Sequence, residues 1–441
     1  MTERNLILGC AFGLIAVMFC LESPAQAIPA FARKTGLRCT SCHEAWPVLN
    51  DFGRAFRDNG YQVRLGKDDP TTTPQGYWPV AIRTTPHYAF TKLTHQDTDQ
   101  GMKDLSNGGV ADGAMDLLTA GTLAPNVSFL VVPTGFASDG AVSLESYFVY
   151  LTRVFFQSDW FNLRIGKHEV DLPASAHRSP NLTNGYLVYG YHSASDATNG
   201  SAALADLGSN QRGVEISGHD RGSFTRYNVS VFNANDSPGS RNLFDSPSIY
   251  AHVQKYWQFD SYGMSEFALG AFGMQASYPT SFLTIGGQPI PGQGGNLKNS
   301  TRYGGEAQMW LGPAATPLHL NAVVAHGSDP VELVGGSATQ DGTWNGGFLE
   351  AVWVPARDQL HWGVFARYDA IRNSKQPIIA TPKDLNDQDQ ITGGIKYTFN
   401  YNNRAEYALH CEYQTNRMKD IASDGSEVTA STFFLGLDFA Y

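Results

Sequence analysis

The sequence ITGGIKYTF, at positions 391–399, places apolar and polar side chains alternately along the chain. Its apolar residues are Ile391, Ile395, Tyr397 and Phe399, and its polar residues are Thr392, Lys396 and Thr398. Successive side chains of a β-strand point to opposite faces, so this pattern predicts a strand with one apolar and one polar face. Positions 161–166 (FNLRIG) and 226–231 (RYNVSV) repeat the pattern, and about sixteen such segments follow one another from residue 80 onward.

The connections between these segments alternate in length. Tight turns are expected near 124–126, 220–221, 260–261, 315–316, 356–357 and 402–403, whereas 170–210 and 277–301 are expected to be long loops. Short connections at one end and long ones at the other are typical of an outer-membrane β-barrel. Closure is required in lipid because an open sheet edge leaves backbone groups unpaired. The sequence therefore predicts a mainly β protein, a transmembrane antiparallel β-barrel of about 16 strands.

Two further features agree with a barrel. The last segment carries apolar residues at every second position and ends on an aromatic one: Phe433, Leu435, Leu437, Phe439 and Tyr441. Aromatic residues make up 12% of the chain, which suits the girdles at the two membrane interfaces. A soluble sandwich or propeller is the alternative, but the sequence has no repeat of fixed period. Basic residues on the polar faces are expected to line the lumen: Arg164, Arg226, Arg367 and Lys396.

The first 27 residues have the composition of a cleavable signal peptide. Arg4 precedes an apolar run at 6–20, and the small residues at 25–27 offer a cleavage site before Ile28. Cys20 lacks the preceding small residues of a lipid-anchor signal, so lipidation is the weaker interpretation. No later apolar stretch reaches the ~18 residues that a membrane helix needs. The net charge of −10 argues against nucleic acid as a partner.

A short motif soon after the signal carries the chemistry. In Cys39-Thr40-Ser41-Cys42-His43 two thiols are spaced to form thioethers with haem vinyl groups, and the adjacent histidine is placed to bind the iron. A dithiol redox pair would be expected in a βαβ domain, and a zinc site would need further cysteine or histidine nearby. We therefore predict one covalently bound haem c, attached at Cys39 and Cys42, with His43 as an axial ligand of the haem iron.

The segment after the motif is expected to pack on that haem. Leu49, Phe52 and Phe56 have helical spacing, which predicts a short amphipathic helix, although an ordinary small core would use the same residues. The sequence does not identify the sixth ligand, and its first candidates are His87, His95 and Met102. The predicted organisation is a signal peptide at 1–27, a small, partly helical monohaem cytochrome c domain at 28–78, and a porin-like barrel at 79–441.

The region around the motif resembles a known family. The stretch IPAFARKTG at 28–36, the haem motif, and Pro47, Leu49, Asn50, Phe52-Gly53-Arg54, Phe56 and Gly60-Tyr61 closely resemble the fused outer-membrane cytochrome-porins of iron-oxidising and related bacteria. The resemblance is dense over roughly 35 residues and architectural beyond them. It implies one haem c before a barrel of about sixteen strands, with Cys39, Cys42 and His43 in the roles given above. Lys34, Arg57 and the sequence Glu44-Ala45-Trp46 depart from the iron-oxidising members, which leaves the electron donor open.

Extracellular electron transfer is the function that these features favour. A haem supplies one-electron chemistry, and Fe(II) is a one-electron donor whose oxidised form precipitates, so its oxidation outside the cell keeps mineral out. We expect a Gram-negative outer-membrane protein that oxidises extracellular Fe(II) and passes electrons to a periplasmic carrier, either a soluble cytochrome or a copper protein. The alternatives are a porin with a haem-bearing plug, another electron donor, or electron flow in the outward direction. No nucleophile and base are arranged for hydrolysis.

Three other groups of residues invite a functional interpretation. The acidic residues Asp97, Asp99 and Asp104 have the oxygen ligands that attract Fe(II), although exposed acidic loops are common. A metal site in or beside the longest loop would draw on His168, Glu169, Asp171, His177 and His192, for which a solvated loop is the plainer interpretation. Cys411 lies in a predicted strand and is expected to be a small apolar residue rather than a reactive thiol.

Overall fold

The computed structural model of this protein describes most of the chain beyond the signal region. The described residues are 29–37, 41–45, 48–63, 79–98, 101–111, 113, 115–135, 142–183, 185–193, 206–233, 247–259, 264–279, 282–285, 288–294, 297–313, 316–331, 339–355, 362–378, 384–401, 406–419, 421 and 424–441. The predicted signal peptide at 1–27 lies outside them. Within these ranges, no helix has the length and apolar character needed to cross a bilayer.

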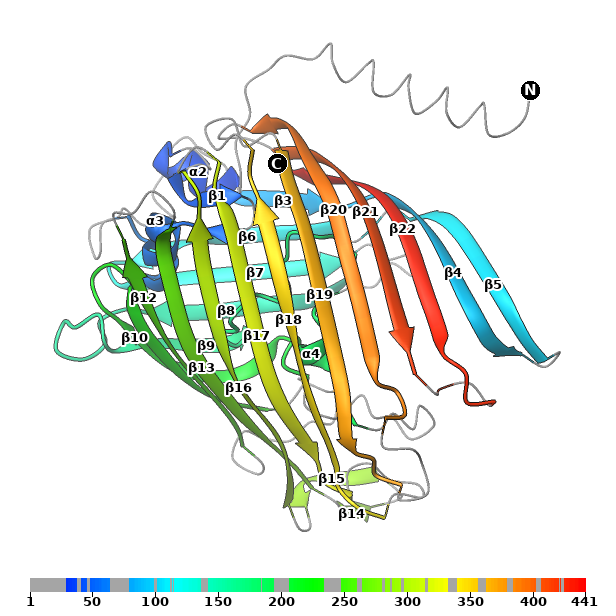
Figure 1. Ribbon diagram of the computed structural model, residues 1–441. Coiled ribbons are helices and arrows are strands. Elements are labelled where there is room, and N and C mark those ends of the chain that lie inside the picture. Colours follow the sequence, from blue (N-terminus) through cyan, green and yellow to red (C-terminus); the bar gives the residue numbers. More distant parts are fainter. Residues whose placement is uncertain are drawn as a thin grey trace, which may run out of the picture.

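Sixteen antiparallel strands of the described chain form a closed barrel (Figure 1). Each pairs with the next, and the last strand closes on the first, where Phe439 pairs with Thr84. The strands are β3 Val80–Thr84, β6 Met115–Ala124, β7 Val127–Gly135, β8 Val142–Leu151, β9 Asn162–His168, β10 Gln211–His219, β11 Thr225–Asn233, β12 Ser248–Gln258, β13 Met264–Pro279, β16 Leu297–Leu311, β17 Leu318–Asp329, β18 Gly342–Trp353, β19 Trp362–Lys375, β20 Gln388–Tyr401, β21 Glu406–Met418 and β22 Val428–Ala440. The predicted barrel of about 16 strands is confirmed.

The strands bury one face and expose the other, as the alternation predicted. On β20, Ile391 and Ile395 are 55% and 45% exposed, whereas Thr392 and Lys396, the residues that follow each of them, are buried in the lumen. On β9, Ile165 likewise faces outward. Apolar side chains on the outside of a closed barrel are what a hydrocarbon environment favours.

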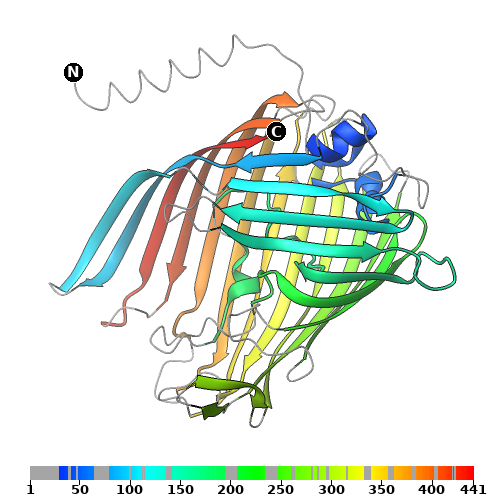
Figure 2. The same ribbon diagram turned by 180° about the vertical axis from the view of Figure 1, so that it is seen from behind.

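One hairpin departs from a regular barrel. Strands β4 (His87–Thr98) and β5 (Gly101–Ala111) continue from β3 past a bend at Thr85 and Pro86, and β4 pairs along β22 from Gly436 to Thr429. Proline donates no hydrogen bond, which favours a break in the ladder there. Figures 1 and 2 show this hairpin beside β22, directed away from β6 to β9. The alternating pattern did not predict this bend.

The two ends of the barrel have different connections. The predicted tight turns at 124–126 and 220–221 are present, while the other four lie wholly or partly outside the described residues. The long loop predicted at 170–210 is also present, between β9 and β10. The loop predicted at 277–301 is wrong, because β13 and β16 continue pairing as far as Pro279 and Leu297 and a small hairpin follows, β14 (Phe282–Ile285) with β15 (Gln288–Gly294). Short turns face the periplasm in bacterial barrels, which assigns the end with the C-terminus to the periplasmic side.

Two helices precede the wall and lie at this periplasmic end. They are α2 (Pro29–Thr35) and α3 (Asp51–Asp58), with the two-stranded β1 (His43–Ala45) and β2 (Val48–Leu49) between them. We call residues 29–63 the N-terminal plug. Arg33 and Lys34 of α2 donate hydrogen bonds to Val80 O and Thr122 Oγ1, at 2.6 and 2.7 Å, which ties the plug to β3 and β6. The described part of the predicted domain at 28–78 is thus partly helical.

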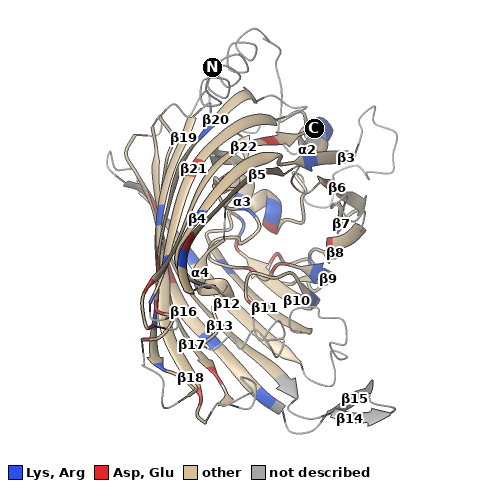
Figure 3. Cartoon of the chain, turned by 90° about the vertical axis from the view of Figure 1, so that its right-hand side faces the viewer, with Lys and Arg blue, Asp and Glu red and all other residues tan. Residues whose placement is uncertain are grey.

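The long loop after β9 folds into the barrel instead of extending from it. Residues 169–183 and 185–193 include the short helix α4 (Leu187–Gly190), which contacts β18 and β19, and Figure 3 shows α4 inside the barrel. We call this segment the inward loop. It joins the largest buried apolar cluster, whose members include Val170, Leu172, Tyr186, Val188, Tyr189, Tyr191, Phe232, Tyr250, Phe272, Trp344, Phe348 and Ile371. The lumen is therefore filled by packed side chains on this side of the plug.

Candidate functional site

The haem motif lies at the start of the plug's small sheet. Cys39 is outside the described residues, Cys42 is in a turn, and His43 begins β1. The backbone N–H of Asn50 donates to Cys42 O at 3.0 Å, and the side chain of Asn50 accepts from Gly53 N at 2.9 Å as the N-cap of α3. Capping of this kind fixes where a helix begins. The same asparagine thus sets the helix start and its position against the motif.

The first turn of α3 touches the motif directly. A Cβ added to Gly53 would lie 2.1 Å from Cys42 O, so only glycine permits this approach. The predicted amphipathic helix is present but begins at Asp51, which leaves Leu49 in β2. Phe56 packs edge to face on Phe31 with ring centroids 5.2 Å apart, whereas Phe52 is 41% exposed. Of the three residues predicted to form the apolar face of this helix, only Phe56 both lies in α3 and packs inside the plug.

A cavity of about 360 Å³ lies between the plug, the wall and the inward loop. Cys42 and His43 border it, and one side is lined by apolar and aromatic groups: Phe31, Leu118, Leu130, Val132 and Phe148. Charged side chains of both signs line other parts, among them Arg57, Arg83, Arg164 and Arg226 with Asp116, Glu145, Glu169, Asp171, Glu350 and Asp438. A cavity of this size is typical of cofactor sites. A haem c requires a thiol, an imidazole and an apolar wall, and cations nearby suit its propionates. The residues around this cavity include all of these groups, so they fit a haem c.

Burial raises the pKa of the Cys42 thiol to about 11. Redox-active dithiols have a lowered pKa, because the thiolate is the reactive form. Burial gives the Cys42 thiol no such activation. Cys411 is a free and exposed cysteine on β21, across from Ile395 on the outward face, in keeping with the predicted small apolar residue.

The plug is fixed to the wall by a buried arginine of α3. Arg54 donates to Glu266 Oε2 and to Asp51 Oδ1, both at 2.7 Å, and its guanidinium lies 4.0 Å from the centre of the Tyr256 ring. Its side chain is almost completely buried. A guanidinium held by carboxylates and an aromatic face is a directional contact, which fixes the orientation of α3 relative to β12 and β13.

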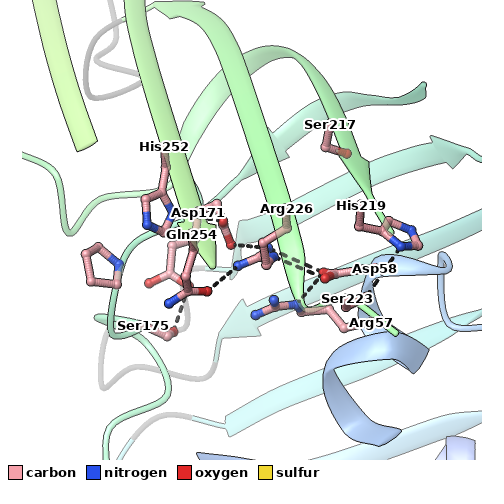
Figure 4. A network of polar contacts seen from close by, with 12 residues as sticks. Arg57, Asp58, Asp171, Ser175, Ser217, His219, Ser223, Arg226, His252 and Gln254 are labelled. Carbon is pink, nitrogen blue, oxygen red and sulfur yellow. Dashed lines mark hydrogen bonds and ion pairs between the residues drawn. The ribbon is translucent and has the colours of Figure 1, made fainter. Parts of the chain in front are cut away.

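A second arginine joins the plug, the wall and the inward loop. Arg226 of β11 contacts Asp58 Oδ2 of α3 at 3.1 Å and Asp171 Oδ1 of the inward loop at 2.8 Å (Figure 4). Asp171 also contacts His252 Nδ1 at 3.0 Å. Burial alone would raise the pKa of Asp58, but the charges of Arg226 and Arg57 outweigh it and hold the pKa below its ordinary value. Likewise, Arg226 and the hydrogen bond from His252 overcome burial and hold the pKa of Asp171 well below its ordinary value.

These lowered pKa values predict that acid weakens the plug. A carboxylate whose pKa is lower in the folded state stabilises that state above its unfolded pKa, and the stabilisation is lost as pH falls through the folded pKa. We expect the free energy of unfolding to be insensitive to these two carboxylates near neutrality and to decline below about pH 4. Urea unfolding at a series of pH values measures this, with Asp58→Asn as the comparison. The variant should lose less stability in acid, and equal acid losses would contradict the prediction.

The metal site considered for His168, Glu169, Asp171, His177 and His192 does not assemble. Among the residues that the structure describes, no three His, Cys, Asp or Glu side chains form a metal-binding cluster. Glu169 instead accepts hydrogen bonds from Ser175 Oγ at 2.7 Å and Ala176 N at 2.6 Å, which shape the inward loop. Asp104 pairs with Lys92 at 3.2 Å on the exposed β4–β5 hairpin. Asp99 and the side chain of Asp97 lie outside the described residues.

The first candidates for the sixth ligand are also not at the cavity. His87, His95 and Met102 all lie on the β4–β5 hairpin, and none of them borders the cavity. His87 stacks on Phe434 with ring centroids 4.6 Å apart. We considered these three residues because they are close to the motif in sequence. The bend at Pro86 directs the strand that follows away from the motif, so closeness in sequence does not bring them to the cavity.

The predicted luminal basic residues are inside the barrel, and carboxylates accompany three of them. Arg164 contacts Glu215 at 2.6 Å, Arg367 contacts Asp369 at 2.8 Å, and Arg226 makes the contacts described above. Lys396 is buried on the luminal face of β20. Sequence reasoning missed Asp58, the plug-side partner of Arg226, and Glu266, the wall-side partner of Arg54. The only available signal was the spacing of Arg54 and Asp58 on one face of α3.

Comparisons with known proteins concern the barrel. No family model and no curated protein matches the sequence. The anion-selective porin from Comamonas acidovorans has a similar structure, with a TM-score of 0.50, 14% identity, and coverage of 82% of this chain and 99% of the porin. This chain has the fold of an outer-membrane porin. The outer membrane channel DcaP of Acinetobacter baumannii (TM-score 0.48, 10% identity, 82% and 97% coverage) and OmpT of Vibrio cholerae (0.46, 10%, 82% and 97%) are more distant.

These likenesses show the fold alone, because the sequence identities are low. They carry no information on a haem or on electron transfer, and the resemblance of the N-terminal region to the cytochrome-porins stays a prediction. The porin-like barrel agrees with the expected outer-membrane lipid environment, as do the outward apolar faces of the strands.

Proposed function

We propose that this chain is an outer-membrane monohaem cytochrome that carries electrons between the cell exterior and the periplasm, with extracellular Fe(II) as the donor. The observation that supports it is the cavity beside Cys42 and His43, which has an apolar wall and basic residues around it. Bound there through Cys39, Cys42 and His43, a haem c supplies reversible one-electron transfer. The plug holds Cys42 and His43 at the end with the short turns, which faces the periplasm in bacterial barrels.

The filled lumen also favours electron transfer over solute passage. Tyr186 of the inward loop donates to Glu350 of β18 at 3.1 Å, and the backbone N–H groups of Leu182 and Thr183 donate to Glu412 of β21 at 2.8 and 3.1 Å. These contacts fix the loop across the lumen. Electrons need no open passage, whereas hydrated solutes do.

The first test is haem attachment and reduction by Fe(II). The purified chain should show covalent haem on a denaturing gel, and Cys42→Ala should lose most of it, whereas Cys411→Ala should keep it because that cysteine lies outside the motif. Stopped-flow absorbance after anaerobic mixing with Fe(II) should then show a rapid rise of the reduced α-band. A haem that Fe(II) leaves oxidised rules out iron as donor, and absence of haem rules out the proposed function.

A second candidate is a porin whose lumen is closed by the plug. The fold comparison favours this candidate more than the first. The Comamonas acidovorans protein, with a TM-score of 0.50, is a porin described as anion-selective. The luminal arginines would suit anions, but carboxylates lie 2.6 Å from Arg164 and 2.8 Å from Arg367, which offsets their charge. Ion conductance in planar bilayers distinguishes the two candidates. Steady porin-like conductance of the intact chain would support the second.

A further inference from the structure

We propose that His168 is the second axial ligand of the haem iron, opposite His43. The inference rests on the proposed function and extends it, because it completes the iron coordination from the barrel wall rather than from the N-terminal plug. Coordination by two elements distant in sequence would make haem binding a contact that joins the plug to the barrel.

The position of His168 fits this role. It is the last residue of β9, on the same luminal face as Arg164, and it is only 2% exposed. Its side chain borders the same cavity as His43 and Cys42. An imidazole on the inside of the barrel wall, at the cavity that the motif histidine also borders, is placed where a second ligand from the wall could approach the iron.

The hydrogen bonding of His168 leaves one nitrogen ready to bind a metal. Its Nδ1 lies 3.1 Å from the carbonyl oxygen of Glu169, which can only accept, so Nδ1 carries the proton and donates. Its Nε2 therefore has a lone pair, and this atom is buried with no hydrogen-bond partner among the described residues. Metal-binding histidines commonly donate their other N–H to a backbone carbonyl in this way. A buried polar atom without a partner is destabilising, and iron coordination would remove that cost.

The surroundings hold the ring and connect it to the plug. The Phe148 ring meets the His168 ring edge to face at a centroid distance of 6.1 Å, and Phe148 stacks on Tyr61 of the plug at 6.4 Å. Phe148 and Tyr61 both line the cavity. The apolar wall expected to cover one face of a porphyrin is thus continuous with the imidazole expected to bind its iron.

Other histidines are weaker candidates. His319 also borders the cavity, and both of its ring nitrogens lack a partner among the described residues, so no hydrogen bond selects its tautomer. It stacks on Trp310 at a centroid distance of 4.1 Å. His177 lies at the cavity but is exposed and 3.6 Å from Glu145. His410 has an Nε2 without a partner in the described chain, but it does not border the cavity.

The test compares His168→Ala with His319→Ala in the full chain, purified in detergent with covalent haem verified by gel staining. Electron paramagnetic resonance and visible absorbance report the spin state. The wild type and His319→Ala should be low-spin, while His168→Ala should become high-spin, bind carbon monoxide when reduced, and return to low-spin when imidazole is added. A low-spin His168→Ala protein, or a high-spin His319→Ala protein, would overturn the assignment of His168. Neither result would contradict the proposed function, because the gel would still show covalent haem.

A second variant addresses folding. His168→Met keeps a ligand at the position, so it should stay low-spin with a higher reduction potential, as thioether ligation raises the potential of c-type haems. Resistance of the folded barrel to detergent before heating verifies assembly of each variant. An unchanged potential in His168→Met overturns the inference. A wild type without covalent haem overturns both the inference and the proposed function.

Discussion

Replacing Arg226 with methionine should lower the free energy of unfolding by about 3 kcal/mol and release the plug from the barrel. The variant removes the contacts to Asp58 at 3.1 Å and Asp171 at 2.8 Å and leaves two buried carboxylates without their shared cation. Loss of one partner from a buried ion pair costs about 3–5 kcal/mol. The lower value applies because Asp58 keeps Arg57 at 3.0 Å and Asp171 keeps His252 at 3.0 Å.

Urea unfolding measured by tryptophan fluorescence, together with limited proteolysis of residues 29–63, tests this expectation. The matched control is Arg372→Met, whose pair with Asp389 at 2.6 Å is solvent-exposed on both sides. Exposed pairs contribute less than about 1 kcal/mol, so the control should change little. Adding Asp58→Asn to Arg226→Met should recover part of the loss, because it removes one of the stranded charges. Equal losses in the two arginine variants would show that Arg226 does not join plug and wall.

The wall of the barrel was predictable from sequence because lipid and lumen impose a period of two. Ile165 and Arg164 are neighbours in the chain, yet one is 46% exposed on the outside and the other contacts Glu215 inside. Local alternation records that difference directly. The bend before β4 was not predictable, since Pro86 among polar residues looks the same in a strand edge, a turn or a loop.

The site depends on contacts that no local pattern contains. Arg226 lies 168 residues from Asp58 and 55 from Asp171, so the sequence shows only that the arginine is luminal. The haem motif could be found because its chemistry requires adjacent residues, whereas a distal ligand has no such constraint. One signal was available for the inward loop. Its run Tyr186-Leu187-Val188-Tyr189 is too apolar for a solvated loop, which indicates burial.

Replacing Tyr189 with alanine should destabilise the inward loop and open the lumen to ions. Tyr189 is 2% exposed, and its ring lies 5.4 Å from Tyr186 and 6.1 Å from Phe348, measured between centroids. Its hydroxyl oxygen accepts a hydrogen bond from Ala174 N at 3.2 Å, within the loop itself. Truncating a fully buried aromatic residue costs about 3–5 kcal/mol, through lost burial and the cavity that remains. Leu182, Thr183 and Tyr186 keep their contacts to the wall, so we expect the loop to loosen around α4 rather than to leave the wall.

Single-channel conductance in planar bilayers measures the opening. The intact chain should conduct poorly and Tyr189→Ala should conduct several-fold more, while urea unfolding shows that the barrel itself persists. Tyr413→Ala is the matched control, since this tyrosine is 52% exposed on the outward face of β21 and touches lipid rather than the lumen. A large conductance in the unaltered chain would contradict a closed lumen and favour the porin candidate. If Tyr189→Ala stays closed, the plug alone seals the barrel and the inward loop is not its barrier.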